Sequence, residues 1–335
     1  MPPTVSDTAP SAAPPAVSPT VLARPVRYPS DGGALLEHLT RAGQLRTTRN
    51  PADDNAAVRP VDCVLLESAD ITTKASRTTV AILEASARLT CWGGTVTAEA
   101  LDAVDGQGPG ADGLAALARL EESLAEHVTD RSPGRLTLTL PTSADDDPTL
   151  EERERLTALS TIEPLRVLAQ AEVDHPHLPL EAGAFAFDYL STFESLPEVA
   201  QGANTCPDYL FYDARIILVV DHPTREATLV GASVDTADLE RRMDALAAAI
   251  DSIDNAADVE APASSTDGAA SPVLHAVPTT SDVDFEAVVE EMRGYIAEGD
   301  VYQVVPSRGF TIACPDALAA YHVLRHANPS PYMFY

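Results

Sequence analysis

The strand-like segments of this 335-residue chain come in clusters and do not alternate one for one with helices. This pattern constrains the fold more than any other feature, because a doubly wound fold needs a helix after almost every strand. The segment 135–140 (RLTLTL) alternates with a period of two, which is typical of a strand with one buried face. We therefore predict an α+β fold in which antiparallel β-sheets pack as a sandwich with flanking helices. The predicted strands are 63–66, 79–83, 135–140, 183–187, 209–220 and 227–234.

Apolar residues at helical spacing predict three amphipathic helices. Two of them lie within 114–128 and 239–253. The third begins after Ser281 or Asp282, either of which can cap a helix, and Gly299 can end it. The final block, 299–335, predicts a strand, a helix and an extended, proline-rich entry into another strand.

Tracts rich in Pro, Ala, Ser, Thr and Asp divide the chain. Residues 1–30 contain too little apolar surface to offset the entropy of ordering, so we predict a disordered N-terminal arm. Residues 256–281 have the composition of a linker. The predicted organisation is therefore an arm (1–30), a first domain (31–255), a linker (256–281) and a last segment (282–335).

The chain is strongly acidic, with 51 Asp and Glu against 22 Lys and Arg and a net charge of −29. This excess argues against a nucleic-acid partner and against binding to an anionic membrane surface. No apolar run reaches the ~18 residues that a membrane-spanning helix needs, and the N-terminus lacks the pattern of a secretory signal. The four cysteines are far apart, as in a reduced protein. We predict a cytoplasmic protein.

Only a few segments carry residues with evident chemistry. His175 and His177 could share a metal ion if they lay on one strand, but no third ligand is evident, and a solvated loop is the simpler interpretation. The run 65–71 (LLESADI) ends an apolar strand in an acid and a hydroxyl, which can bind the ammonium and carboxylate of an amino acid. A strand end at which Ser68 caps a turn explains the same residues.

Two further segments are rich in aromatic residues. The run 206–212 (CPDYLFY) predicts an aromatic strand entry that belongs to the core. Near the C-terminal end, Tyr332, Met333 and Phe334 offer adaptable apolar surface for a flat ring, although core packing would use them equally well.

Five stretches together resemble the anthranilate synthase component I family of chorismate-utilising enzymes. The order and spacing of these stretches match the family from about residue 60 to the end. The resemblance implies a large subunit that makes anthranilate from chorismate and ammonia or glutamine, in the first step of tryptophan biosynthesis. The stretches are LLESADI (65–71), AFAFDYLSTFESLP (184–197), CPDYLFY (206–212), GDVYQVVPSRGF (299–310) and NPSPYMFY (328–335).

The resemblance also implies a site at which tryptophan acts as a feedback inhibitor. One part of the site is the strand end near residue 67, and the other follows over 260 positions later. The family thus favours the ligand-binding interpretation of Ser68. Family members often supply a basic residue nearby, for which Lys74 and Arg77 are the candidates here. The site residues implied are Leu66, Glu67, Ser68, Pro331, Tyr332 and Met333.

Gln303 is the one residue that we assign to the chorismate site. In the family, the strand that carries this position runs past that site, and isochorismate and salicylate synthases have a lysine there that activates water. A neutral glutamine cannot act as a general base, and ammonia needs none because it is already nucleophilic. Gln303 therefore favours an aminating enzyme. The PYMF segment favours anthranilate synthase, with aminodeoxychorismate synthase component I as the alternative.

The chain ends at Tyr335, before the motifs of the family's catalytic half. That half supplies the acidic ligands of the Mg²⁺ cofactor, which the resemblance implies for the full-length enzyme. We therefore expect an N-terminal fragment that is inactive alone, and a glutamine amidotransferase subunit (component II) as partner of the whole enzyme. The alternative from a different class is a stand-alone module that binds tryptophan or an amidotransferase and performs no chemistry.

Overall fold

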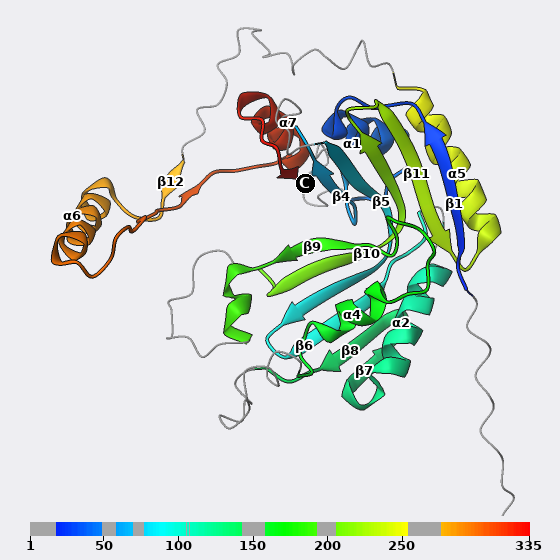
Figure 1. Ribbon diagram of the computed structural model, residues 1–335, viewed down its shortest axis with the longest axis horizontal. Coiled ribbons are helices and arrows are strands. Elements are labelled where there is room, and N and C mark those ends of the chain that lie inside the picture. Colours follow the sequence, from blue (N-terminus) through cyan, green and yellow to red (C-terminus); the bar gives the residue numbers. More distant parts are fainter. Residues whose placement is uncertain are drawn as a thin grey trace, which may run out of the picture.

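Ten strands form one antiparallel sheet in the computed structural model (Figure 1). The model describes residues 18–48, 58–69, 77–104, 106, 108–142, 158–192, 206–253 and 276–335. The strands are β1 (Thr20–Val26), β4 (Val64–Glu67), β5 (Thr78–Trp92), β6 (Thr95–Ala100), β7 (Val128–Ser132), β8 (Arg135–Thr139), β9 (Glu181–Phe185), β10 (Tyr209–Asp221), β11 (Glu226–Ser233) and β14 (Met333–Phe334). They follow the order β1-β11-β10-β5-β6-β8-β7, while β9 also pairs with β10, and β4 pairs with both β5 and β14.

The two long central strands, β5 and β10, change neighbours halfway along their length. Towards one end β5 pairs with β4 and β10 pairs with β11, whereas towards the other end β5 pairs with β6 and β10 pairs with β9. Register shifts between Asp213 and Ile217 mark the point of change, where bulges increase the local twist. The predicted α+β fold with antiparallel strands and flanking helices is confirmed. Its two sheets are the halves of one curved sheet that share β5 and β10.

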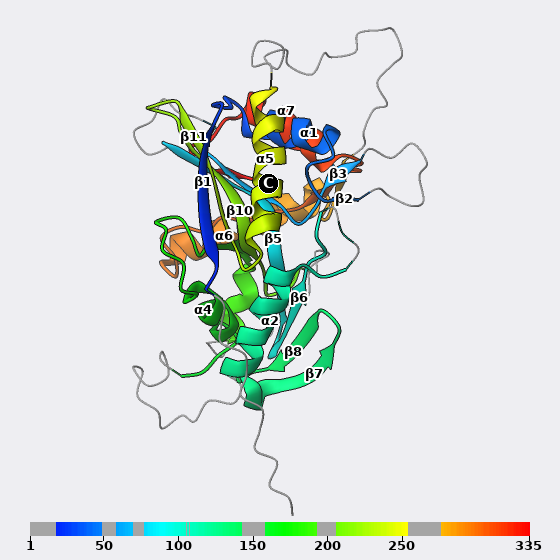
Figure 2. The ribbon, with the colours of Figure 1, turned by 90° about the vertical axis from the view of Figure 1, so that its right-hand side faces the viewer.

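Helices cover the two halves of the sheet separately (Figure 2). Helices α1, α5 and α7 pack on the half that contains β4 and β11, and α2 and α4 pack on the half that contains β6 and β8. The helices are α1 (Gly32–Arg41), α2 (Ala111–Ser123), α4 (Glu163–Ala169), α5 (Thr236–Asp251), α6 (Asp282–Glu298) and α7 (Ala317–Ala327). Two short 3₁₀ turns, η1 (Ala125–His127) and η3 (Phe187–Thr192), and two small ribbons, β2–β3 (Thr47–Thr48, Arg59–Pro60) and β12–β13 (Val277–Pro278, Phe310–Thr311), complete the described elements.

Local sequence signals account for where several elements begin and end. Helix α6 starts at the predicted cap, because the Ser281 side chain accepts from the backbone of Asp284, and it stops at Gly299, whose φ is 87°. In β8 the predicted alternation is confirmed, since Leu136 and Leu138 are buried between more exposed neighbours. These buried leucines pack against α2 in the hydrophobic core of the half of the sheet that contains β6 and β8.

Two of the predicted domain boundaries need correction. Strand β1 lies inside the predicted disordered arm, and it pairs along its whole length with β11, over 200 positions later. Composition alone could not reveal a strand whose partner is so distant. The last segment, 282–335, is also not separate from the first domain, because β14 joins the main sheet and α7 packs against α1. Residues 1–17 and 254–275, with most of the predicted linker, lie outside the described residues.

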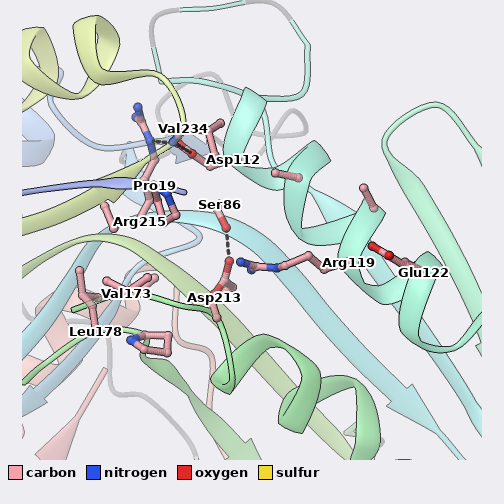
Figure 3. Close-up of a pocket in the computed structure, with 16 residues that line it drawn as sticks. Pro19, Ser86, Asp112, Arg119, Glu122, Val173, Leu178, Asp213, Arg215 and Val234 are labelled. Atoms are coloured by element: carbon pink, nitrogen blue, oxygen red, sulfur yellow. Dashed lines mark hydrogen bonds and ion pairs between the residues drawn. The ribbon is translucent and has the colours of Figure 1, made fainter. Parts of the chain in front are cut away.

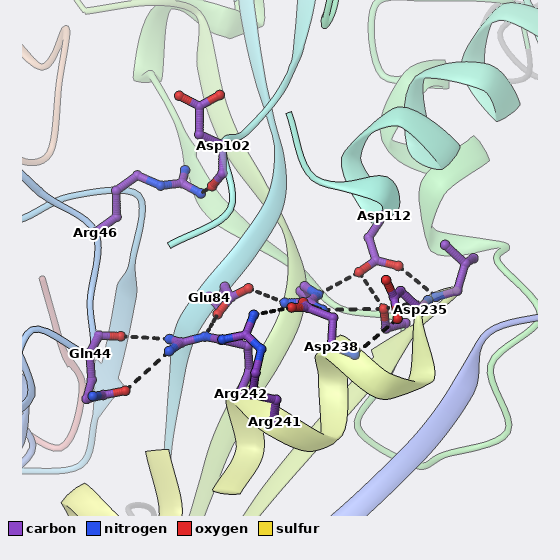
Figure 4. Close-up of polar contacts among 12 residues, drawn as sticks. Gln44, Arg46, Glu84, Asp102, Asp112, Asp235, Asp238, Arg241 and Arg242 are labelled. Atoms are coloured by element: carbon purple, nitrogen blue, oxygen red, sulfur yellow. Dashed lines mark hydrogen bonds and ion pairs between the residues drawn. The ribbon is translucent and has the colours of Figure 1, made fainter. Parts of the chain in front are cut away.

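A buried group of charged side chains joins the bulged strands to α2 and α5 (Figure 4). Glu84 of β5 ion-pairs with Arg215 of β10 and Arg242 of α5, and all three side chains are at most 7% exposed. Arg215 also contacts Asp112 of α2 at 2.6 Å and Asp238 of α5 at 2.5 Å. Burial lowers the pKa of Arg215, but Glu84 and Asp112 outweigh burial, so the pKa is raised and the guanidinium stays charged.

Glu84→Gln tests how far the fold depends on this group. We expect a loss of about 3 kcal/mol in the free energy of unfolding, because two buried guanidinium groups lose the carboxylate that they share. Urea unfolding followed by circular dichroism measures the loss. Glu121→Gln is the matched control, since it breaks an exposed ion pair with Arg131 and should cost less than about 1 kcal/mol. Equal losses in the two variants would contradict the assignment.

Candidate functional site

The two stretches of the predicted tryptophan site meet in the structure. Strands β4 and β14 pair antiparallel, and Met333 lies opposite Glu67. Leu65 and Tyr335 exchange two backbone hydrogen bonds, of 2.9 and 3.0 Å, at the end of this pair. Segments that lie over 260 positions apart in the sequence thus form one edge of the main sheet.

A cavity of about 450 Å³ opens beside β4 and β14. This volume is in the range of ordinary small-molecule pockets, roughly 300–1,000 Å³. The cavity contains five of the six residues that the sequence assigned to the site, and Pro331 is not part of its lining. The lining residues are Leu66, Glu67, Ser68, Arg77, Thr78, Tyr332, Met333 and Phe334.

Ser68 lines this cavity and is buried, with 5% of its surface exposed. Its hydroxyl donates to the carbonyl of Thr78 at 2.9 Å, and its backbone N–H donates to Oγ1 of Thr79 at 3.1 Å. The hydroxyl proton is therefore in use, while the oxygen lone pairs can still accept a hydrogen bond. A ligand group at Ser68 would have to be a donor, as an ammonium is.

The Glu67 carboxylate is occupied by contacts within the protein. It accepts from the backbone N–H of Gly32 at 2.7 Å, from the Tyr321 hydroxyl at 2.6 Å and from Nε of Arg325 at 3.0 Å. Burial, together with the Glu67 charge, raises the pKa of Tyr321, so the phenol stays a proton donor. Glu67 thus holds the start of α1 and one face of α7 against β4. The prediction that it also contacts a ligand ammonium stays a prediction.

Arg77, one of the two basic residues that the sequence offered, supplies a cation at the cavity. Its side chain is among the lining residues, whereas Lys74 lies outside the described part of the chain. A guanidinium binds a carboxylate with charge-assisted hydrogen bonds. The cavity therefore combines an acceptor, a cation and an apolar wall in which Met333 is buried and Tyr332 is exposed.

Gln303 does not lie on a strand, so the sequence-based prediction for its secondary structure is wrong. Residues 299–309 contain no helix or strand, and the next strand, β13, pairs only with β12. The Gln303 side chain is exposed. The largely apolar run 301–305 is too short to specify a strand unless another strand pairs with it, and none of the described strands does. A role of Gln303 in catalysis stays a prediction.

The described residues do not provide a metal site. They contain no group of three or more His, Cys, Asp or Glu side chains placed to hold an ion. His175 and His177 contact each other, since the backbone N–H of His177 donates to Nδ1 of His175 at 3.2 Å. This part of the chain does not fit Mg²⁺, and no chemical step through that ion follows from it.

The described helices differ from helices that span a membrane. None of the described helices combines the length and the apolar character that crossing a bilayer requires.

Comparison with known proteins identifies the family. The model of the chorismate binding enzyme family matches residues 130–335, which is more than half of the chain. The chain belongs to this chorismate-binding family. The resemblance inferred from its motifs is thereby confirmed, and the family match covers strands β8 to β11 of the main sheet and the last segment with β14.

Curated relatives within the family are anthranilate synthases. The chain is 35% identical over 281 residues to anthranilate synthase component 1 of Vibrio parahaemolyticus, which covers 82% of this chain and 48% of that protein. The corresponding values for the Escherichia coli protein of the same name are 35% over 277 residues, 81% and 50%. The chain thus spans about half the length of these relatives. A solved anthranilate synthase component I from Streptococcus pneumoniae aligns with a TM-score of 0.42 and 20% identity, over 78% of this chain and 47% of that one.

Tyr321→Phe tests the attachment of α7 to β4. We expect the free energy of unfolding to fall by about 1.5–3 kcal/mol, because the buried Glu67 carboxylate loses a hydrogen-bond donor. Tyr295→Phe is the control: this exposed hydroxyl donates to Glu291 on the surface of α6, and its loss should cost less than about 0.5 kcal/mol. Urea unfolding compares the two. A Tyr321 variant as stable as the control would show that the contact adds nothing.

Proposed function

We propose that this chain forms the part of an anthranilate synthase component 1 that binds tryptophan as a feedback inhibitor. The observation that carries the proposal is the cavity of about 450 Å³ at which residues 66–68 and 332–334 meet beside Arg77. The names of the curated relatives support the choice of subfamily. The cavity supports it independently, because its groups match the three parts of a tryptophan molecule.

In the proposed complex, each part of tryptophan has a chemically suitable partner. The Arg77 guanidinium binds the carboxylate, and Oγ of Ser68 accepts a hydrogen bond from the ammonium. The indole ring lies against Met333 and Tyr332, since a thioether and an aromatic ring form favourable contacts with a flat aromatic group. Leu66, which is 40% exposed and lines the same cavity, loses contact with water when the ring is bound.

Binding at this place would also act on the helices behind it. The ligand bridges β4 and β14, and Glu67 on β4 is tied to Tyr321 and Arg325 on α7. Because α7 leads directly into β14, a ligand that stabilises the β4–β14 pair also restrains α7. Feedback inhibition in the whole enzyme would then operate through the position of the segment 317–334.

For the reaction of the whole protein, we infer the amination of chorismate to anthranilate. A glutamine amidotransferase subunit supplies ammonia, and Mg²⁺ is the cofactor. The neutral side chain of Gln303 suits an amine nucleophile, which needs no general base. Amination to aminodeoxychorismate is the second candidate, because it uses the same substrate and the same nucleophile.

Ser68→Arg tests the tryptophan site. Titration calorimetry of the 335-residue chain should show that tryptophan binds, and that the substitution raises the Kd at least about tenfold, since the new side chain fills the cavity beside the ammonium position. Arg77→Gln should weaken binding to a similar extent, because the carboxylate loses a charge-assisted contact. Ser132→Arg on the exposed strand β7 is the control and should leave the Kd unchanged. Equal affinity in all variants would remove this cavity from consideration.

Product analysis tests the reaction. The protein is expressed from the complete reading frame that encodes this chain, and it is incubated with chorismate, ammonia and Mg²⁺. We expect anthranilate, because the segment 331–334 resembles that of anthranilate synthases. Formation of aminodeoxychorismate would instead assign the second candidate. A protein that binds tryptophan but converts no chorismate would be a binding module.

A further inference from the structure

A second cavity, of about 440 Å³, lies between α2 and the face of β10 (Figure 3). It shares no lining residue with the cavity beside β14. Ala115 and Ala118 of α2 form one wall, and Val173 and Leu178 form the opposite wall. None of the described residues that line it is aromatic, so its apolar part suits an aliphatic group of moderate size.

Two charged side chains of opposite sign face each other at one end of this cavity. Asp213 of β10 is 8% exposed and accepts a hydrogen bond from Ser86 of β5. Arg119 of α2 points towards it (Figure 3), but no hydrogen bond or ion pair joins these two described side chains. Within the described part of the chain, the buried Nε of Arg119 has no hydrogen-bond partner. Such a donor, taken out of water and left unpaired, is costly unless another molecule satisfies it.

A buried acceptor without a partner among the described residues lies next to Asp213, on a residue that does not itself line the cavity. Glu181 of β9 is directly opposite Asp213 in the antiparallel pair, so the two side chains lie on the same face of the sheet. Oε1 of Glu181 is buried, and none of the described residues donates to it. Burial, and then the nearby Asp213, raise the pKa of Glu181 to about 7, and burial also raises the pKa of Asp213. Two carboxyl groups thus lie near the single guanidinium of Arg119.

Three other charged residues line the cavity, of which Glu122 is exposed on α2 and the other two are already engaged within the protein. Arg215 and Asp112 line it, but they bind each other at 2.6 Å, and each has further partners in the buried charge group. The unsatisfied atoms are therefore one donor on Arg119 and one acceptor on Glu181. A molecule that satisfies both must carry an acceptor and a donor close together.

From this arrangement we propose that the second cavity binds an aliphatic α-amino acid in its zwitterionic form. The ligand carboxylate accepts from Arg119, and the ligand ammonium donates to Asp213, which lines the cavity, with Oε1 of Glu181 beside it as a second acceptor. The aliphatic side chain lies between Ala115, Ala118 and Leu178. This site is separate from the proposed tryptophan site and does not depend on it.

Leucine is the probe, and two compounds that each lack one charged group are its controls. Titration calorimetry of the 335-residue chain should give a Kd for leucine at least about tenfold lower than for isopentylamine or 4-methylpentanoate, because each analogue loses a charge-assisted hydrogen bond. If the amine or the acid bound as tightly as leucine or more tightly, the proposal that the ligand is a zwitterion would be wrong. No heat with any of the three would show that water alone satisfies the buried atoms and would refute the proposal.

Substitutions in and away from the cavity test where leucine binds. Arg119→Gln and Asp213→Asn should each raise the Kd for leucine about tenfold or more, and Ala115→Leu should abolish binding by filling the cavity while every polar group remains. Ala248→Leu on the exposed face of α5 is the control for the added volume. Ser68→Arg, in the other cavity, should leave the affinity for leucine unchanged. If Ser68→Arg weakens leucine binding, or if Ala115→Leu does not, leucine binds elsewhere and the proposal is wrong.

Discussion

The fold depends on the contact of Glu84 with two buried arginines where β5 and β10 change neighbours. At this point both strands bulge, so the ladder is irregular and side chains from β5, β10, α2 and α5 converge. The charges compensate one another within the protein, and removing one partner would leave others buried without a counter-charge. This group therefore sets how the two halves of the curved sheet, each with its own core and helices, are joined.

A second buried carboxylate, that of Glu67, positions the candidate tryptophan site. It binds the first turn of α1 and two side chains of α7, so β4, α1 and α7 are held together behind the cavity. The sequence resemblance implies a ligand contact for Glu67, which stays a prediction, and the structure shows that this side chain also supports the residues around it. Ser68, Arg77 and Met333 are among the residues that line the cavity.

The two cavities of this chain differ in ways that their chemistry explains. The cavity beside β14 has a sulfur atom and aromatic rings in its lining and suits a flat ring. The cavity beneath α2 has aliphatic side chains in its walls and the charged side chains of Arg119 and Asp213 at one end. Each cavity lies next to one of the buried charge groups. At these places strands bulge or end, which leaves space that regular packing would fill.

The sequence by itself determined the fold class, the strands at 135–139 and 226–233, and the helix between Ser281 and Gly299, because local patterning and capping specify these elements. Its motifs also identified the family and the two stretches of the candidate site. Only the tertiary structure decided that β1 is a strand, that Gln303 is not on one, and that Arg77 lines the cavity. Such features depend on partners that are distant in the sequence. The unpaired atoms of Arg119 and Glu181 could likewise not be predicted, because whether a buried group has a partner is decided by packing.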